Sequence, residues 1–174
     1  MSTWRRRDVL RGAGVALGAT LLPLRGAWPA EGFELPETTR KELERSPYVY
    51  VSPLHPDGRE SRCHGEVWFF VHRGDVVIAT GQDRWKARAL ERGWRRARLW
   101  VGDHGRVKKD GERFRKGPSF VAQASRDRDR ATFEALMRRF ASKYPTEWGK
   151  WEPRFRKGYG DGSRVLIRYH PIAL

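Results

Sequence analysis

The chain has 174 residues, of which 36 are Lys or Arg and 21 are Asp or Glu, so its formal net charge is +15 at pH 7. Its single cysteine excludes an internal disulfide, and that cysteine and the five histidines form no zinc-ligand motif. A positive field of this size attracts anions, such as nucleic acid, phosphate-bearing cofactors or an acidic membrane surface. Stability must come from packing, for which the chain supplies eight Trp and eight Phe residues.

The first 30 residues have the pattern of an export signal. Arg6-Arg7 is followed by the apolar pair Val9-Leu10 and by Arg11, an arrangement typical of twin-arginine signals. The apolar run over 12–24 is too short to cross about 30 Å of hydrocarbon as a helix. We therefore expect the twin-arginine (Tat) translocase to export the protein to the periplasm or its equivalent. The alternatives are a basic, disordered arm or a start codon placed too early.

The end of this segment is less well defined. Trp28 and Pro29 interrupt the nearest small-residue cleavage motif, so retention as a membrane anchor stays open. Five of the basic residues and one acidic residue precede position 31, which leaves 31 basic against 20 acidic residues and a net charge of +11. Residues 31–174 are long enough for one domain with a real core.

Alternation of β-branched and aromatic residues with turn residues predicts a mainly β domain. The first expected elements are a helix over 36–46, with Thr38 or Thr39 near its cap, and three strands in meander order over 48–52, 59–71 and 76–80, with a turn at Asp57-Gly58. A helix of about three turns follows between Gly81 and Gly93, and then come strands over 97–102 and 118–124, separated by a charged stretch over 103–116. A long helix is expected to open at 126 and to end near Tyr144-Pro145, followed by an irregular stretch over 148–162 and a last strand over 164–169. This pattern predicts an α+β fold: a small antiparallel barrel of about six strands, closed or half-closed, with helices in the connections.

The junction after the strand over 76–80 carries the strongest chemical signal. There a strand end leads through Gly81 into a helix, and Thr80, Arg84, Lys86 and Arg88 add a hydroxyl group and three cations. Free backbone N–H groups at a helix start and nearby cations favour a phosphate site. The alternative is an ordinary basic surface helix.

Several short motifs occur in a recognisable order: Tyr48-Val49-Tyr50-Val51, a His55–Arg59 turn containing Asp57-Gly58, an aromatic run over 66–71, Ile78–Gly81, and Lys86–Leu90. This order resembles the split β-barrel flavoprotein superfamily, the pyridoxamine 5′-phosphate oxidase-like proteins and their deazaflavin-dependent relatives. The resemblance covers roughly residues 46–172, including Lys143-Tyr144 followed by Trp148. Gly93-Trp94 replaces the usual Asn-Pro, and the stretch over 103–116 is an insertion.

The resemblance implies a cofactor, FMN or a deazaflavin, between the barrels of a homodimer. In that superfamily the lysine and arginine of a T-x(n)-K-x-R-x-L segment bind the cofactor phosphate, and Thr80, Lys86 and Arg88 match this segment. Trp68, His64 and Gln123 are expected on strands that could face the ring or the substrate, although for Trp68 a core role is favoured over a cofactor contact. The expected cofactor-binding residues are Thr80, Gln82, Arg84, Lys86, Arg88 and Trp68.

Two functions follow from these observations. The first is an exported flavin or deazaflavin oxidoreductase of open substrate, in which the cofactor supplies the hydride chemistry and no catalytic triad is needed. The second is a non-enzymatic protein that binds a flavin, haem or another anion on the same barrel. Specific nucleic-acid recognition is disfavoured because the basic residues lack an interleaved aromatic stripe.

Overall fold

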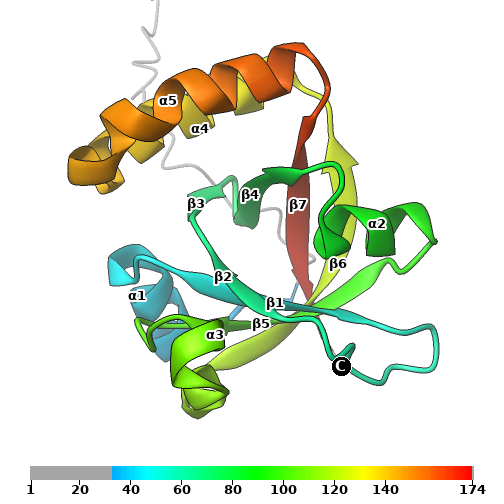
Figure 1. Cartoon of the computed structure of the whole chain (residues 1–174). Coiled ribbons are helices and arrows are strands. Elements are labelled where there is room, and N and C mark those ends of the chain that lie inside the picture. The colour runs from blue at the N-terminus through cyan, green and yellow to red at the C-terminus, as the bar shows by residue number, and fades with distance from the viewer. Residues whose placement is uncertain (1–32, 174) are drawn as a thin grey trace, which may run out of the picture.

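A computed structural model describes residues 33–173 (Figure 1), and the expected signal over 1–30 lies outside them. The elements are α1 (Glu37–Arg45), β1 (Val49–Leu54), β2 (Gly65–Val67), β3 (Phe69–His72), β4 (Asp75–Gly81), α2 (Trp85–Glu91), β5 (Arg96–Val101), α3 (Val107–Asp110), the 3₁₀ helix η1 (Arg113–Lys116), β6 (Ser119–Asp127), α4 (Arg130–Lys143), α5 (Pro145–Gly160) and β7 (Arg164–Ile172). Among these helices, none is both long and apolar enough to cross a membrane.

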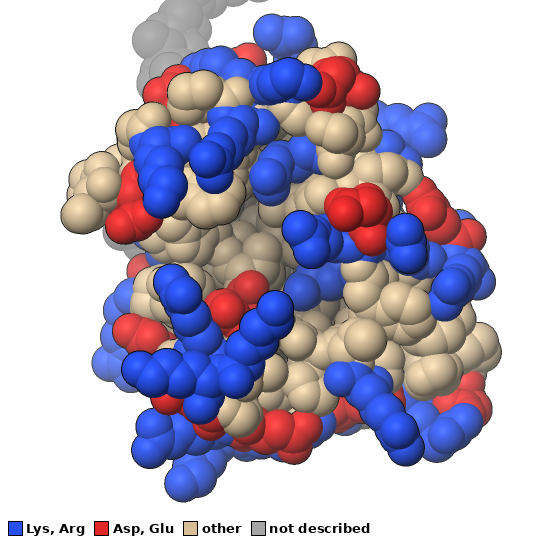
Figure 2. Space-filling model, viewed as in Figure 1, with Lys and Arg blue, Asp and Glu red and all other residues tan. Residues whose placement is uncertain are grey.

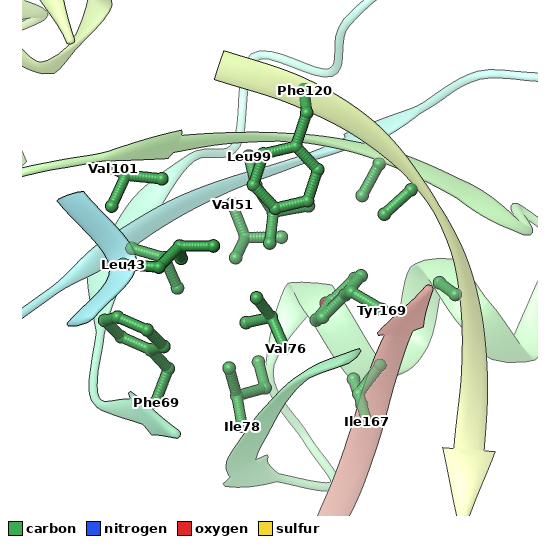
Figure 3. Close-up of a cluster of buried hydrophobic side chains, with 14 of the residues drawn as sticks. Leu43, Val51, Phe69, Val76, Ile78, Leu99, Val101, Phe120, Ile167 and Tyr169 are labelled. Carbon is green, nitrogen blue, oxygen red and sulfur yellow. The ribbon is translucent and has the colours of Figure 1, made fainter. Parts of the chain in front are cut away.

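All seven strands belong to one antiparallel sheet in the order β2-β1-β5-β6-β7-β4-β3. The long strands β6 and β7 pass between the upper and lower halves of the molecule in Figure 1, so the sheet curls around a common interior. Figure 3 shows that interior, where Val51, Val76, Leu99, Phe120 and Ile167 point toward one another from five different strands. The α+β barrel with helices in its connections is confirmed.

The two edge strands of the sheet are neighbours in the chain. β2 pairs with β1 and β3 pairs with β4, yet only Trp68 separates them. Two residue steps span at most about 7 Å, so the edges of the curled sheet must approach each other, and the barrel is split at Trp68. The expected single return strand over 59–71 was therefore wrong, as was the meander of three strands, and the division raises the strand number from about six to seven.

Alternation along β4 separates two cores. Val76 and Ile78 face the barrel interior, whereas Val77 and Ala79 face a second apolar cluster beneath α4 and α5. Because successive side chains of a strand point to opposite faces, β4 is buried on both sides. This explains its nearly continuous apolar sequence.

The region after the barrel strands is more helical than expected. The stretch over 148–162, predicted to be irregular, lies mostly in α5, which starts with Pro145 and contains Pro153. Proline is favoured at the first helical position, and burial of Trp148 and Phe155 against α4 and β7 stabilises the rest. The glycines and prolines of this stretch misled the prediction because tertiary packing outweighed local propensity.

Three element boundaries also differ. Arg126 and Asp127 belong to β6, where they pair with β7, and Asp129 caps α4 by accepting hydrogen bonds from the backbone of Ala131 and Thr132. α1 begins after Pro36, so neither Thr38 nor Thr39 caps it. α2 has only seven residues.

The charged insertion over 103–116 is also ordered against the barrel. It contains α3 and η1. Phe114 is buried there and stacks on Tyr50 with ring centroids 5.0 Å apart.

Candidate functional site

A cleft of about 480 Å³ lies where the barrel is split. Its lining comes from the residue before β1, from β2, from the second half of β4 and from α5. Figure 2 shows the hollow between the helical layer and the lower half of the barrel, with Lys and Arg side chains along its rims. The lining residues are Tyr48, Glu66, Val67, Trp68, Ala79, Arg106, Glu147, Lys150, Trp151, Phe155 and Arg164.

Trp68 supplies the aromatic wall of the cleft. Its ring stacks on Tyr144, with centroids 4.2 Å apart, and meets Trp151 edge-on at 6.2 Å. Trp68 is fixed in position because it is the one residue between β2 and β3, which lie at opposite edges of the sheet. One face of Trp68 therefore packs on the core residue Tyr144, and Trp68 also lines the cleft. Both the core role and the cleft-facing role considered for Trp68 thus apply.

Arg164 is the cation best placed inside the cleft. Its guanidinium lies 4.2 Å from the Phe155 ring centroid, and its buried Nε has no hydrogen-bond partner among residues 33–173. Burial, and secondarily the positive charge of Arg84, lower the pKa of Arg164. A half-buried arginine with an unpaired donor beside a second arginine is a favourable place for an anion.

Arg84 lies near Arg164, across Gly81, but is not among the residues that line the cleft. Gly81 is the cross-strand partner of Arg164, and a Cβ on Gly81 would lie 3.2 Å from Arg84 Cγ. The absence of a side chain at Gly81 thus lets Arg84 lie over the end of β4. Arg84 itself remains exposed, near Asp83 at 3.7 Å.

Lys86 lies beneath β2 rather than in the cleft lining. A Cβ on Gly65 would be 3.5 Å from Lys86 Nζ. Burial lowers the pKa of Lys86 to about 8, and the nearby Glu66 and Cys63 oppose this shift. Lys86 therefore adds positive charge behind Glu66, which lines the cleft.

The other expected cofactor ligands point elsewhere. Thr80 continues the inward-facing row of Val76 and Ile78, on the opposite face of β4 from Ala79. Gln82 lines a different pocket, and Arg88 is exposed and absent from the cleft lining. Of the six expected cofactor-binding residues, only Trp68 thus lines the cleft. Lys86 lies behind Glu66 and Arg84 lies near Arg164, whereas Thr80, Gln82 and Arg88 lie elsewhere.

His64 and Gln123 also lie outside the cleft lining. His64 Nε2 is 3.0 Å from Glu112, and its ring packs on Phe114. Gln123 is exposed on β6, opposite His170 of β7. Within residues 33–173, no three His, Cys, Asp or Glu side chains cluster in a way that could hold a metal ion.

Sequence reasoning missed Arg106, Lys150, Trp151, Phe155 and Arg164. Three of these lie on α5 or directly behind it, in the stretch predicted to be irregular. The spacing of Trp148, Trp151 and Phe155 by three and four residues is the signal that could have identified this helix.

Comparisons with known proteins show the fold. No protein-family model matches the sequence, and no curated protein matches it significantly. Among solved structures, the haem storage protein HutZ from Vibrio cholerae aligns over 82% of this chain and 93% of its own, at 13% identity and a TM-score of 0.55. A conserved hypothetical protein from Mycobacterium tuberculosis aligns over 82% and 83%, at 17% identity and a TM-score of 0.52.

A protein from Listeria innocua, provisionally assigned as a pyridoxamine 5′-phosphate oxidase, aligns over 76% of this chain and 89% of its own, at 13% identity and a TM-score of 0.49. At these identities the likeness concerns the fold alone.

Proposed function

We propose that the cleft binds a flavin-type cofactor, FMN or a deazaflavin, and that the protein is an oxidoreductase. The observation that carries this proposal is the combination, in one cleft, of an aromatic wall, Trp68 and Trp151, with Arg164, while Arg84 lies beside Arg164 outside the lining. A cleft of about 480 Å³ falls within the size range of small-molecule sites. Planar rings and phosphate groups are the two chemical features that such a lining recognises.

Each side chain has a role that follows from its place. Arg164, with its unpaired Nε, would hold the phosphate group, and Arg84 would add positive charge beside it. Trp68, held against Tyr144, packs on the ring and excludes water from it. When bound, the cofactor supplies hydride transfer, while the protein supplies orientation and charge.

We also propose that the active form is a homodimer. β3 is an edge strand of the sheet, and Val71 on it is 41% exposed. An unpaired edge with an exposed apolar residue favours burial by a second chain. Static light scattering on the cofactor-loaded protein tests this directly, because a monomer at micromolar concentration would contradict it.

Titration of purified protein with FMN, riboflavin and a deazaflavin tests the site, with quenching of cofactor fluorescence as the readout. The decisive variant is Arg84→Ala with Arg164→Ala. If two charge-assisted hydrogen bonds of about 1.5 kcal/mol or more are lost, FMN affinity falls at least about a hundredfold. Riboflavin has no phosphate, so its affinity should stay nearly unchanged.

The matched control is Arg138→Ala with Arg139→Ala, which removes the same charge from an exposed face of α4. Equal losses of FMN affinity in the two variants would show that diffuse charge attracts the cofactor. Oxidoreductase activity is tested by anaerobic reduction of bound FMN with NADPH or NADH, followed in the visible spectrum. An absence of cofactor binding by the parent protein would overturn the proposal.

A non-enzymatic haem-binding protein is the second candidate. The observation that favours it is His170, an exposed side chain whose Nδ1 lies 2.7 Å from Asp75. A histidine oriented by a carboxylate in this way can offer its other nitrogen to a metal. It lies at the far end of β7 from Arg164, outside the cleft. Hemin titration of the parent and of His170→Ala, read as a Soret shift, separates this candidate from the flavin proposal.

A further inference from the structure

A second pocket lies on the opposite face of β7 from the cofactor cleft. Its volume is about 220 Å³, and it lies between α2, the start of β5 and strands β6 and β7. Whereas Arg164 lines the cleft, the next residue, Val165, lines this pocket. The lining residues are Gln82, Ala87, Leu90, Glu91, Arg95, Arg126, Arg128, Val165 and Ile167.

Three arginines surround this pocket. Arg126 continues the inward-facing row of Ala122 and Ala124 on β6 and is the cross-strand partner of Ile167. Arg95 precedes β5, where its carbonyl accepts a hydrogen bond from the backbone of Ala124. No Asp or Glu among residues 33–173 forms an ion pair with Arg95, Arg126 or Arg128. The three arginines are exposed, and Glu91 lines the pocket as well, so the lining carries three positive charges against one negative charge, which favours an anionic ligand.

Gln82 adds a second and independent feature. Its Nε2 donates to Glu91, and its Oε1 is buried without a hydrogen-bond partner in the described part of the chain. The reverse amide orientation would place Oε1 against the Glu91 carboxylate, so the unpaired atom is an acceptor. A buried acceptor without a partner is costly, and a ligand that carries a proton would satisfy it.

We propose that this pocket binds a phosphate group that carries a proton, as free phosphate or as a phosphate monoester. The three arginines hold the charged oxygens, and the P–OH group donates to Gln82 Oε1. Ala87, Leu90, Val165 and Ile167 form an apolar floor that accepts a short carbon chain. The site is separate from the cofactor cleft and does not depend on the function proposed for that cleft.

Comparison of phosphate with sulfate tests the proposal. The two ions have similar size, but near pH 6 sulfate is a dianion without protons, whereas phosphate is mostly a monoanion with P–OH groups. Charge alone would therefore favour sulfate, and a preference for phosphate points to a hydrogen bond donated by P–OH. The full chain carrying Arg84→Ala and Arg164→Ala is used, so that the cleft cannot hold the anion, and affinity is measured by calorimetry. We expect phosphate to bind about tenfold more tightly than sulfate, as one hydrogen bond allows.

Gln82→Leu in the same background should abolish this preference while leaving sulfate affinity nearly unchanged. Adding Arg95→Ala with Arg126→Ala should weaken both anions, and adding Arg138→Ala with Arg139→Ala should weaken neither. Equal affinity for phosphate and sulfate before the Gln82 change, or a preference that survives it, would overturn the proposal. Because Gln82→Leu replaces a buried polar atom with an apolar group, we expect thermal unfolding without ligand to show a stable fold.

Two further arms distinguish the source of the phosphate. Binding of glycerol 3-phosphate near pH 6, where a monoester is about half protonated, supports a soluble ester. Sedimentation with vesicles containing phosphatidic acid, without binding of glycerol 3-phosphate, supports a lipid headgroup. Failure to bind inorganic phosphate, glycerol 3-phosphate and the vesicles would overturn the site.

Discussion

Trp68 stacks face to face on Tyr144, with ring planes 5° apart and centroids separated by 4.2 Å. Tyr144 is itself fixed, because its hydroxyl group donates to the Pro47 carbonyl at 2.8 Å and accepts from the Phe69 backbone at 3.2 Å. Burial raises the pKa of Tyr144, so this hydroxyl remains a donor in the neutral range. Trp68, the residue at the split in the barrel, is thus held by Tyr144, which lies between α4 and α5.

Trp68→Ala should therefore weaken both cofactor binding and folding. We expect the free energy of unfolding to fall by about 2 kcal/mol, less than for a fully buried tryptophan, and FMN affinity to fall at least about tenfold. Urea unfolding and fluorescence titration measure the two effects. Trp94→Ala is the control, because Trp94 packs on Trp85 and His55 outside the cleft. Comparable losses of FMN affinity in both variants would contradict the assignment of Trp68.

Arg168 should be the most sensitive charged residue for stability. It bridges Asp75 at 2.7 Å and Asp127 at 2.6 Å, and the two carboxylate side chains are only 12% and 7% exposed. Arg168→Ala leaves both acids without their cation, which should lower the free energy of unfolding by about 3–5 kcal/mol. Arg156→Ala removes an exposed pair with Glu152 and should cost less than about 1 kcal/mol. Chemical denaturation of the two variants should show this contrast, and similar small losses would refute it.

Two glycines of α5 should respond in opposite directions to the same substitution. A Cβ on Gly149 would meet nothing within 4 Å, so Gly149→Ala should stabilise the protein by about 0.5–1 kcal/mol through helix propensity. A Cβ on Gly158 would lie 2.9 Å from Arg164 Cβ. Gly158→Ala should therefore push α5 away from β7, lower the melting temperature and reduce FMN affinity. Stabilisation by both changes would mean that Arg164 is less tightly confined than its contacts indicate.

Stability should increase with pH from about pH 7 to about pH 10. Burial lowers the pKa of Lys86 to about 8 and that of Lys143 to about 7, both from 10.5. Between these values and 10.5 the unfolded chain binds more protons than the folded chain, so the free energy of unfolding rises with pH. Above about pH 10 it should fall, because burial raises the pKa of Tyr144 and Tyr169 and the unfolded tyrosines ionise first.

Urea unfolding across this pH range checks the prediction. Lys143→Met should flatten the part of the rise that begins near pH 7. A flat profile for the parent protein would show that both lysines escape burial in solution.

Export by the twin-arginine route stays a prediction, motivated by Arg6-Arg7 and the weak apolar run after them. Arg6→Lys with Arg7→Lys should abolish transport of a fused periplasmic reporter, because the lysine pair keeps the charge but not the guanidinium geometry. The control replaces Arg25 with lysine, outside the pair. Undiminished transport of the double variant would reject the route.

The sequence alone located most of the strands, because period-two alternation of apolar residues is a local property of the chain. It also located the basic junction that contains Arg84 and Lys86. It could not show that Val67 and Phe69 belong to opposite edges of the sheet, since pairing partners are chosen by burial of both faces across distant strands. For the same reason Arg164 was missed, because only the pairing of β7 with β4 places Arg164 beside Gly81. Thr80 and Gln82 were predicted to bind the cofactor because they lie close to Arg84 and Lys86 in the sequence. In the structure, alternation along β4 points Thr80 into the barrel. The split barrel, not the junction motif, decides which residues share the cleft.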